Sequence, residues 1–506
     1  MISQWIFGIL FVVLFFNTRY TGDDVISWPV NAFFTIDPLV GITAMAAGRR
    51  LLGFFWPVLI LVPLTLLVGR AFCGWICPMG GLLDMFGRVS QVRSPGPVGR
   101  FYPVKDILLV ILLLSSVFAV NLSGLFDPLS ILIRSLAMGV VHPLERSIHG
   151  VFDLAWKAGP PVSTLTEPVY RFLTQHLLSF QLPVFRYTIL FLLILVLIVL
   201  LELRERRFWC RNLCPLGAFF GWCSTAGPLG LSIEKPACTA CGQCTPTCRM
   251  GAITGEGKRE IRKRDCILCY DCIGSCEDGL IAHRPAPAVS QGQVTPLLPM
   301  TRRGFLGAAG AGVLLPLTMG RAANPDGLPA DLIRPPGAAP ENRFLGLCLR
   351  CGECMRVCLT NGLQPTLFEA GAEAMWTPRL VSRLGYCEYS CTLCGQVCPT
   401  GAIAHLDTVR KRTVCIGTAI IDRDRCIPFV KPEQCMVCEE HCPTPEKAIV
   451  FDDVPVEGAD GPVIVKRPRV IEDLCIGCGI CENKCPLDSR SAIIMVRDGE
   501  DRAVDS

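Results

Sequence analysis

The sequence predicts an α-helical membrane domain of about four transmembrane helices, followed by cysteine-rich α+β domains. Three observations lead to this fold class. The 506 residues are 51% hydrophobic and only 18% charged, with a mean hydropathy of +0.44, which is too apolar for an ordinary soluble enzyme. Thirty cysteines are far more than average usage, in a chain too long for a small disulfide scaffold. Only two of them precede residue 200, so the apolar part comes first and the metal-binding part second.

Four apolar runs are expected to form the transmembrane helices. A helix rises 1.5 Å per residue, and the hydrocarbon core of a bilayer is about 30 Å thick. The first run has a cleaved secretory signal as its alternative, but it lacks a basic leading segment and a small-residue cleavage site before Tyr20. We therefore expect a retained helix there. The runs are Ile2–Phe16, Leu51–Val68, Ile107–Leu122 and Tyr187–Leu201.

An internal repeat is present in this apolar half. The sequence DPL at 37–39 precedes an apolar span that ends in RAFCGWICPMG at 70–80, and DPL at 127–129 precedes a span that ends in RFWCRNLCPLG at 207–217. Cysteines four apart share one face of a helix, where they could bind metal, exchange electrons or line a quinone site. Their alternative role is that of small buried hydrophobic residues. The repeated cysteines are Cys73, Cys77, Cys210 and Cys214.

Two cysteine quartets directly after the apolar half have the bacterial ferredoxin spacing C-x2-C-x2-C-x3-C. Three closely spaced thiolates bind one cubane cluster, and the fourth reaches the neighbouring cluster. The spacing therefore predicts two 4Fe-4S clusters. Arg249 and Glu277 stand where a proline usually follows the fourth cysteine. The expected ligand sets are Cys238, Cys241, Cys244 and Cys276 for one cluster, and Cys266, Cys269, Cys272 and Cys248 for the other.

Four further quartets predict four more clusters. Two are irregular, by one extra residue before Cys391 and by eight residues between Cys426 and Cys435. We expect nested pairing, in which the first quartet pairs with the fourth and the second with the third; sequential pairing is the alternative. Zinc also binds C-x2-C pairs but would not require this rhythm six times. The quartets are Cys348, Cys351, Cys354, Cys358; Cys387, Cys391, Cys394, Cys398; Cys426, Cys435, Cys438, Cys442; and Cys475, Cys478, Cys481, Cys485.

These quartets use twenty-four of the thirty cysteines, and the repeat uses four more. Cys223 and Cys415 have no partner by spacing, so we expect them to be structural. The complete fold class is thus an α-helical membrane domain followed by α+β bacterial-ferredoxin-like 4Fe-4S domains.

A twin-arginine motif occurs inside the chain. Thr301-Arg302-Arg303-Gly304-Phe305-Leu306 and the apolar run to Met319 resemble the export signal that carries folded proteins across a membrane. The alternative is a basic cap on an ordinary helix. An even number of spans from an inside N-terminus returns the chain to the cytoplasm before this motif, in agreement with the arginines that follow the second and fourth spans.

Four ranges summarise the expected organisation. Loop-forming runs at Pro285–Pro299 and Ala322–Pro340 separate the cysteine blocks. The expected domains are a transmembrane domain with two CxxxCP motifs (1–225), a cytoplasmic two-cluster ferredoxin domain (226–285), a linker with the internal twin-arginine-like signal or anchor (286–340) and a four-cluster polyferredoxin domain, expected in the periplasm (341–506).

The chain as a whole resembles a fusion of two ferredoxin-type families. The part to Cys276 is similar to the NapH and MauN membrane proteins, and the part from Thr301 is similar to the exported NapG and MauM proteins; the paired Cys-x3-Cys-Pro motifs are the most specific element. The resemblance implies a quinol dehydrogenase of the inner membrane. It would oxidise quinol from the membrane pool and relay the electrons through six 4Fe-4S clusters to a periplasmic acceptor, such as a nitrate reductase or a multihaem cytochrome.

The sequence contains few candidates for acid-base chemistry. His142, Glu145 and His149, in the loop between the third and fourth spans, are candidates for accepting protons from quinol; a solvated loop is the alternative. A net charge of +4 does not indicate nucleic-acid binding. Two rival functions use the same cysteines: a cluster-sensing or maturation factor, and an anchored cytoplasmic polyferredoxin fed by soluble donors. Six clusters in series favour conduction of electrons.

Overall fold

Helices form most of the described part of the first 226 residues. The protein is described from a computed structural model, which describes residues 2–20, 22–26, 28–89, 101–176, 178, 183–234, 237–255, 259–285, 300–319, 328–458 and 461–501. The helices of this half are α1 (Ile2–Asn17), η1 (Val30–Ile36), α2 (Pro38–Gly48), η2 (Gly53–Phe55), α3 (Val58–Val68), α4 (Ala71–Trp75), α5 (Pro78–Val89), α6 (Val104–Val117), α7 (Ser123–Phe126), α8 (Pro128–Arg134), the π-helical η3 (Ser135–Val141), α9 (His142–Lys157), α10 (Pro160–His176), α11 (Thr188–Leu201), α12 (Phe208–Asn212) and α13 (Pro215–Ala226).

The repeated DPL sequences begin two equivalent helices. Asp37 caps α2 by accepting backbone N–H bonds from Leu39 and Val40, and Asp127 caps α8 by accepting one from Ser130. The proline that follows each aspartate occupies the first helical turn, where its missing N–H costs nothing. Both aspartates are fully buried and their side chains interact with each other, so the two halves of the repeat meet at these caps.

The repeated Cys-Pro motifs separate two helices instead of lying on one. Cys73 lies in α4, whereas Cys77 precedes α5, and Cys210 lies in α12, whereas Cys214 caps α13 through a bond from the Gly217 N–H to its Sγ at 3.3 Å. The expectation that each pair shares one helix face is therefore wrong. The physical reason is the proline, which starts a new helix because it cannot continue the preceding one.

The helices at the expected spans are α1, α3, α6 and α11, of 16, 11, 14 and 14 residues. The last three are shorter than the apolar runs that predicted them, whereas α1 matches its run to within one residue. Within the described part of the chain, no single helix has both the length and the apolar composition needed to cross a membrane. One bent pair, η1 with α2, satisfies both criteria together, with its two axes 82° apart. The membrane-spanning role of the helical domain stays a prediction.

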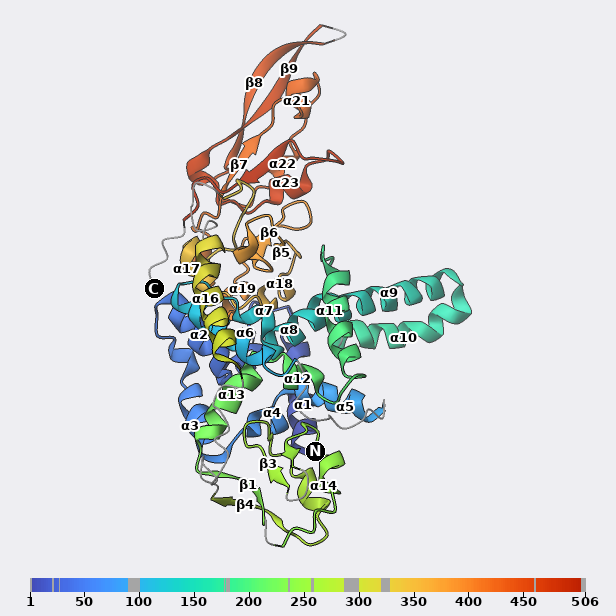
Figure 1. The fold of residues 1–506 in the computed structure, drawn as a ribbon. Coiled ribbons are helices and arrows are strands. Elements are labelled where there is room, and N and C mark those ends of the chain that lie inside the picture. Colours follow the sequence, from blue (N-terminus) through green and yellow to red (C-terminus); the bar gives the residue numbers. More distant parts are fainter. Residues whose placement is uncertain are drawn as a thin grey trace.

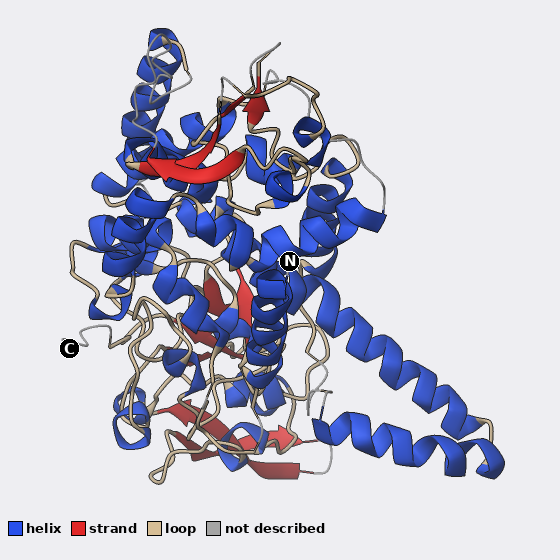
Figure 2. Cartoon of the chain, turned by 90° about the horizontal axis from the view of Figure 1, so that it is seen from below, coloured by secondary structure: helices blue, strands red, loops and turns tan. Residues whose placement is uncertain are grey.

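The segment expected as a loop between the third and fourth spans is a helical hairpin. Helices α9 and α10 pack against each other, and the hairpin projects from the body in both views (Figures 1 and 2). Charged and apolar residues alternate here with a helical period, which is why the segment folds as two amphipathic helices.

A small ferredoxin domain follows the helical bundle. Its outer strands, β1 and β4, pair antiparallel, as do the short strands β2 and β3. Each of the two cysteine quartets contains one short helical turn before its last cysteine. The elements are β1 (Leu229–Ile233), α14 (Cys244–Thr247), β2 (Ile253–Thr254), β3 (Glu260–Ile261), α15 (Asp271–Gly274) and β4 (Ile281–Pro285).

The last domain contains two ferredoxin-like units and a long hairpin. Strands β5 and β6, β7 and β10, and β8 and β9 form three antiparallel pairs. The elements are α17 (Glu341–Leu347), α18 (Glu353–Arg356), β5 (Leu363–Pro365), η6 (Ala372–Ala374), β6 (Pro378–Leu380), α19 (Leu393–Gln396), α20 (Thr408–Lys411), β7 (Thr418–Ile421), α21 (Ile427–Val430), α22 (Val437–Glu440), β8 (Ile449–Gly458), β9 (Gly461–Val470), η7 (Glu472–Leu474), α23 (Ile480–Lys484) and β10 (Ile493–Val496).

The two cysteine-rich domains lie at opposite ends of the helical bundle (Figure 1). Each docks through a glycine of the bundle. A Cβ at Gly74 would overlap the carbonyl oxygen of Ile267, and a Cβ at Gly124 would overlap that of Leu349. Ile267 and Leu349 each follow the first cysteine of a quartet, so both domains bring their cysteine loops directly against the bundle.

The helix after the twin arginines runs beside the bundle. Helix α16 (Arg302–Met319) packs along α6, where Gly312 faces Ile111 and Leu114. Leu315 and Met319, near its end, pack with Leu112, Val120 and Leu122. Helix α16 thus leads from the end of the bundle that carries the first ferredoxin domain toward the end that carries the second. Most of the two expected linkers, residues 286–299 and 320–327, lies outside the described residues.

Candidate iron-sulfur centres

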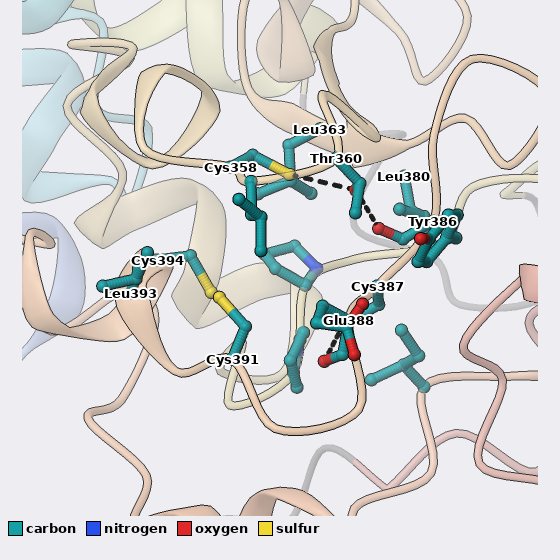
Figure 3. A pocket seen from close by; sticks show the side chains of 14 residues that line it. Cys358, Thr360, Leu363, Leu380, Tyr386, Cys387, Glu388, Cys391, Leu393 and Cys394 are labelled. Atoms are coloured by element: carbon teal, nitrogen blue, oxygen red, sulfur yellow. Dashed lines mark hydrogen bonds between the residues drawn. The ribbon is translucent and has the colours of Figure 1, made fainter. Parts of the chain in front are cut away.

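The cysteines of the C-terminal domain surround four separate sites. Cys358 lines one cavity together with the first three cysteines of the next quartet (Figure 3). Reciprocally, Cys398 lines a cavity with the first three cysteines of the preceding quartet, and Cys485 lines one with those of the third quartet. Cys442 interacts with Cys475 and Cys478, which completes the exchange.

The pairing is therefore sequential, and the expected nested order is wrong. The first quartet exchanges its fourth cysteine with the second, and the third with the fourth. Neighbouring quartets close shorter loops than distant ones, at a lower cost in chain entropy. We name the four sites the bundle set (Cys348, Cys351, Cys354, Cys398), the second set (Cys358, Cys387, Cys391, Cys394), the third set (Cys442, Cys475, Cys478, Cys481) and the tip set (Cys426, Cys435, Cys438, Cys485).

The irregular spacings each have a structural cause. The extra residue before Cys391 exposes the carbonyls of Glu388 and Tyr389, which accept bonds from Lys411 Nζ at 2.6 and 3.1 Å. The eight residues before Cys435 form α21 and attach to β9, where Gln434 Nε2 donates to the carbonyl of Ile464 at 2.7 Å. Both insertions tie a cysteine loop to a neighbouring element.

The sets can bind 4Fe-4S clusters by the chemistry and placement of their donors. Cavities of about 440 and 400 Å³ separate the thiols of the second and tip sets. The fourth cysteine of a set accepts a backbone N–H bond, from Ile403 to Cys398 and from Ala492 to Cys485, both at 3.4 Å. Such bonds stabilise a thiolate and tune the potential of an iron-sulfur cluster, whose chemistry is to take up and release single electrons.

Burial holds the free thiols in their protonated form. It raises the pKa of Cys438 to about 12 and that of Cys426 to about 11, with the neighbouring thiols as a further cause. Binding of iron must therefore displace protons, as thiolate ligation generally does. Among the described residues, no group of three or more His, Cys, Asp or Glu side chains has the arrangement of a site for one metal ion.

The first ferredoxin domain brings together one of its two expected ligand sets, and the other set stays a prediction. Cys248 lines a cavity of about 340 Å³ with Cys266, Cys269 and Cys272, and its Sγ accepts the Ala252 N–H at 3.2 Å. The other set lies across α14 and α15: Cys244 interacts with Cys241, and Gln243 donates to Glu277, which follows Cys276, at 3.4 Å. Cys238 begins this set.

Arg249, in place of the usual proline, connects this domain to the helical bundle. Its Nη1 bonds Asp84 of α5 and its Nε bonds Asp271, both at 2.5 Å. The Asp84 carboxylate also accepts two hydrogen bonds from Arg207, from Nη2 at 2.7 Å and from Nε at 2.8 Å. Burial opposes the ionisation of Asp84, but the two guanidinium groups outweigh it and hold the pKa of this carboxyl well below its usual value. The sequence showed the missing proline but not its structural role.

A second buried contact strengthens the same interface. Asp265, which precedes Cys266, accepts bonds from Tyr102 at 2.8 Å and from Lys105 at 3.3 Å, and all three side chains are buried. A buried charge pair of this kind is retained only where further hydrogen bonds satisfy it. The first ferredoxin domain is therefore held rigidly against the bundle.

The four sets of the C-terminal domain follow one another without a break. The backbone N–H of Cys387 donates to the carbonyl of Cys478 at 2.8 Å, which joins the second set to the third. Cys481 of the third set interacts with Cys438 of the tip set. The order in space, from the bundle outward, is bundle set, second set, third set and tip set, and the tip set lies beside the β8–β9 hairpin (Figure 1).

The repeated cysteines of the two halves converge. Cys77 interacts with Cys210 and Cys73, and Cys214 interacts with all three. Cys77, Cys210 and Cys214 are buried and Cys73 is half-buried. Sequence comparison of the two halves revealed the pairs, but not that they meet. The other two cysteines belong to none of the sets. Cys223 is in α13, and the Cys415 thiol donates to the carbonyls of Gly417 and of Cys475 in the third set, both at 3.3 Å.

Two of the three proposed proton acceptors are buried together. His142 Nδ1 lies 3.3 Å from Glu145 Oε2, and His142 Nε2 is buried without a protein partner. Arg356, between Cys354 and Cys358, interacts with Glu145. His149 lies farther along α9, with its Nδ1 2.8 Å from the Tyr170 hydroxyl. None of the three lies in a solvated loop, because the segment is helical.

Comparison with known proteins agrees with this construction. Residues 50–96 and 185–231, the two halves of the repeat, both match the family model of a 4Fe-4S binding domain, and residues 468–490 match a second model of the same description. Both stretches of the first match contain one Cys-x3-Cys-Pro motif.

The alignments with curated relatives cover about two thirds or more of the length of each relative. The chain is 35% identical to the methylamine utilization ferredoxin-type protein MauM of Methylorubrum extorquens over 173 residues, which are 33% of this chain and 74% of the relative. It is 35% identical to the ferredoxin-type protein NapG of Escherichia coli over 162 residues, 31% of this chain and 67% of the relative. It is 22% identical to NapH of Escherichia coli over 255 residues, 48% of this chain and 72% of the relative. The chain belongs to the family of NapG- and MauM-type ferredoxin proteins, which bind iron-sulfur clusters and transfer electrons.

Proposed function

We propose that this protein is a membrane-bound quinol dehydrogenase that passes electrons from the quinone pool, through a series of 4Fe-4S clusters, to an acceptor in the periplasm. The observation that carries the proposal is the unbroken order of four cysteine sets from the helical bundle to the tip of the last domain. A sensing or maturation factor has no need of such an order. A series of redox sites that ends at an exposed tip suits delivery of electrons to another protein.

Exposed apolar side chains support a position in a lipid bilayer. Leu59, Ile189 and Leu317 of three different helices are 76, 73 and 73% exposed. Water disfavours such a surface on so many helices, whereas hydrocarbon does not. The apolar residues with large exposure on the proposed spanning helices are Ile2, Trp5, Ile6, Ile9, Leu59, Ile60, Leu64, Leu67, Ile189, Leu193, Leu197, Leu200, Leu306, Leu314 and Leu317.

The two ends of the bundle suggest the two sides of the membrane. Arg302 and Arg303 are exposed at the start of α16, which then runs along α6 to the other end. In our proposal residues 226–285 stay in the cytoplasm, α16 crosses the membrane, and residues 341–506 are periplasmic. Export by a twin-arginine route suits a domain that must acquire its clusters before it crosses.

The His142–Glu145 pair is the proposed acceptor of quinol protons. Oxidation of one quinol releases two protons and two electrons. Because His142 Nε2 is buried and lacks a protein partner, a quinol hydroxyl could satisfy it, and Glu145 would stabilise the charge that the imidazole gains. Arg356 joins this pair to the loop of the bundle set, so proton and electron acceptance occur close together.

Quinol-driven reduction tests the activity. The rate at which a reduced quinol analogue reduces the clusters of the C-terminal domain is followed by EPR in detergent. We expect His142→Ala to lower this rate about tenfold or more, a typical loss for a general base, while reduction by dithionite stays unchanged. His149→Ala is the matched control. Absence of any quinol-driven reduction in the unaltered protein would refute the proposal.

A reporter fusion tests the sidedness. A reporter that is active only in the periplasm, fused after Ser506, should be active in the unaltered chain. It should lose activity when Arg302 and Arg303 are both replaced by lysine, because twin-arginine transport requires the arginine pair. A reporter inserted near residue 285 should report the cytoplasm in both. Equal periplasmic activity in the double variant would reduce the motif to a helix cap.

A further inference from the structure

The strongest unexplained feature is the meeting of the four repeat cysteines at the junction between the bundle and the first ferredoxin domain. Each half of the repeat supplies only one pair, so neither half alone can complete four-fold ligation. Cys73 and Cys77 come from the first half, and Cys210 and Cys214 from the second; Cys214 interacts with the other three. We name them the repeat set.

The two halves reach across to each other with equivalent residues. Arg207, three residues before Cys210, donates to the carbonyls of Cys73 at 3.0 Å and Gly80 at 3.3 Å. Arg70, three residues before Cys73, lies against Gly217, where an added Cβ would come within 2.9 Å of its Nη2. The repeat set is therefore the centre of a two-fold arrangement, with one buried guanidinium from each half.

Arg70 is a buried cation without a direct salt bridge to a carboxylate among the described residues. Its side chain is fully buried, and within the described part of the chain it forms no salt bridge. Nη1 donates to the carbonyl of Arg264 at 2.7 Å, Nη2 faces Cys73 Sγ at 3.9 Å, and Nε has no hydrogen-bond partner. A guanidinium buried in this way requires a nearby anion. Cys73 of the repeat set faces this guanidinium most directly, and Asp265 and Cys214 are the other groups near it that can supply negative charge.

Backbone donors and position fit a bound thiolate centre as well. The Gly217 N–H bonds Cys214 Sγ at 3.3 Å, and the Gly80 N–H stands in the same relation to Cys77. These donors match the N–H bonds to the fourth cysteines of the ferredoxin sets. The repeat set also adjoins the first ferredoxin domain, because Trp75 Nε1 donates to the carbonyl of Leu268 at 2.8 Å.

We propose that Cys73, Cys77, Cys210 and Cys214 together bind a seventh 4Fe-4S cluster, with Arg70 and Arg207 offsetting the negative charge of its thiolate ligands. The two matched stretches, both described as 4Fe-4S binding, then form one cluster site between them. The site extends the series of cysteine sets from the first ferredoxin domain into the bundle. It goes beyond the proposed function, since neither quinol oxidation nor sidedness requires it.

Iron and sulfide analysis of the whole chain tests the proposal. Protein purified without oxygen should contain about twenty-eight iron and twenty-eight sulfide per chain, because each cluster holds four of each. The variant Cys73→Ser with Cys214→Ser should contain about twenty-four. Cys223→Ser, which changes a half-buried cysteine of the same repeat outside the set, is the control and should keep twenty-eight.

Each other result overturns the proposal. About twenty-four iron in both the unaltered chain and the double variant would make the repeat cysteines packing residues. Twenty-four iron with one zinc or copper that the double variant lacks would assign the set to a single ion. If the double variant does not accumulate, the unaltered chain still decides, because dithionite reduction should yield about seven EPR-active spins with the cluster and six without it. The readouts do not depend on quinol, so they stand apart from the test of the proposed function.

Discussion

At the scale of single residues, a threonine two positions after a ligand accompanies three of the four sets in the last domain. Thr360, Thr400 and Thr444 have Oγ1 at 3.8, 3.9 and 3.2 Å from the sulfur of Cys358, Cys398 and Cys442, respectively. After Cys485 the corresponding residue is Leu487, which cannot donate. The hydroxyl closest to its sulfur, that of Thr444, is the one whose removal should be measurable.

Thr444→Val should lower the reduction potential of the third set. The reduced cluster carries more negative charge, so a hydroxyl donor to its thiolate stabilises the reduced state. A hydrogen bond of about 0.5–1.5 kcal/mol corresponds to roughly 20–60 mV for one electron. A redox titration followed by EPR measures the shift, and Thr444→Ser, which keeps the hydroxyl, should not show it. An unchanged potential in the valine variant would mean that the hydroxyl does not donate to the sulfur.

The buried carboxyl group of Glu373 should make the free energy of unfolding depend on pH. Burial raises the pKa of Glu373 to about 7, with Arg350 opposing the shift. Between the unfolded value near 4.5 and 7, the unfolded chain releases its proton first, so stability falls as pH rises through this window. Glu373→Gln should therefore stabilise the protein at pH 8 by up to roughly 3 kcal/mol and change little at pH 4.5. Denaturation at both pH values measures it; equal gains at both would contradict the cause.

At the scale of elements, close approach of backbones decides where the ferredoxin domains dock. Gly124 and Gly74 allow cysteine loops to touch the bundle, and polar contacts then fix the position. Asn121 Nδ2 donates to the carbonyl of Gly346 at 2.9 Å, and Arg134 Nη1 donates to that of Arg350 at 2.7 Å. These are contacts to backbone atoms, which is why sequence patterns did not identify them.

Gly124→Val should separate the C-terminal domain from the bundle without unfolding it. A Cβ at this position overlaps the carbonyl of Leu349, and neither backbone can move aside cheaply. Quinol-driven reduction of the last four clusters should fall, while iron content and dithionite reduction stay normal. Gly150→Val, at a glycine of α9 with nothing within 4 Å, is the control. Normal quinol-driven reduction in the Gly124 variant would show that electrons do not enter at this contact.

The Cys-Pro motifs show how much of an element can be anticipated. The proline predicts a helix start, and both α5 and α13 begin there. The shared helix face expected for each cysteine pair fails for the same reason, because a new helix has a new axis. Periodicity arguments apply only within one uninterrupted helix.

At the scale of the whole molecule, the order of the sets predicts which clusters lose quinol-driven reduction when one set loses a ligand. Cys354→Ala, in the bundle set, should prevent quinol-driven reduction of all later sets. Cys438→Ala, in the tip set, should leave the first three sets reducible by quinol but stop delivery to an external acceptor. EPR of quinol-treated protein distinguishes the two variants, with dithionite reduction as the measure of clusters still present. Equal effects of the two variants would contradict a single path.

The sequence by itself determined the ligand chemistry of this protein. The x2-x2-x3 rhythm is a local property, since thiols so close along the chain must face one cluster, and the repeat is visible as matching residues. The tertiary structure alone decided which quartets exchange ligands, that the repeat cysteines converge, and that Arg249 and Asp84 join two domains. These relations depend on how distant segments pack against each other, and the spacing of cysteines along the chain does not specify that packing.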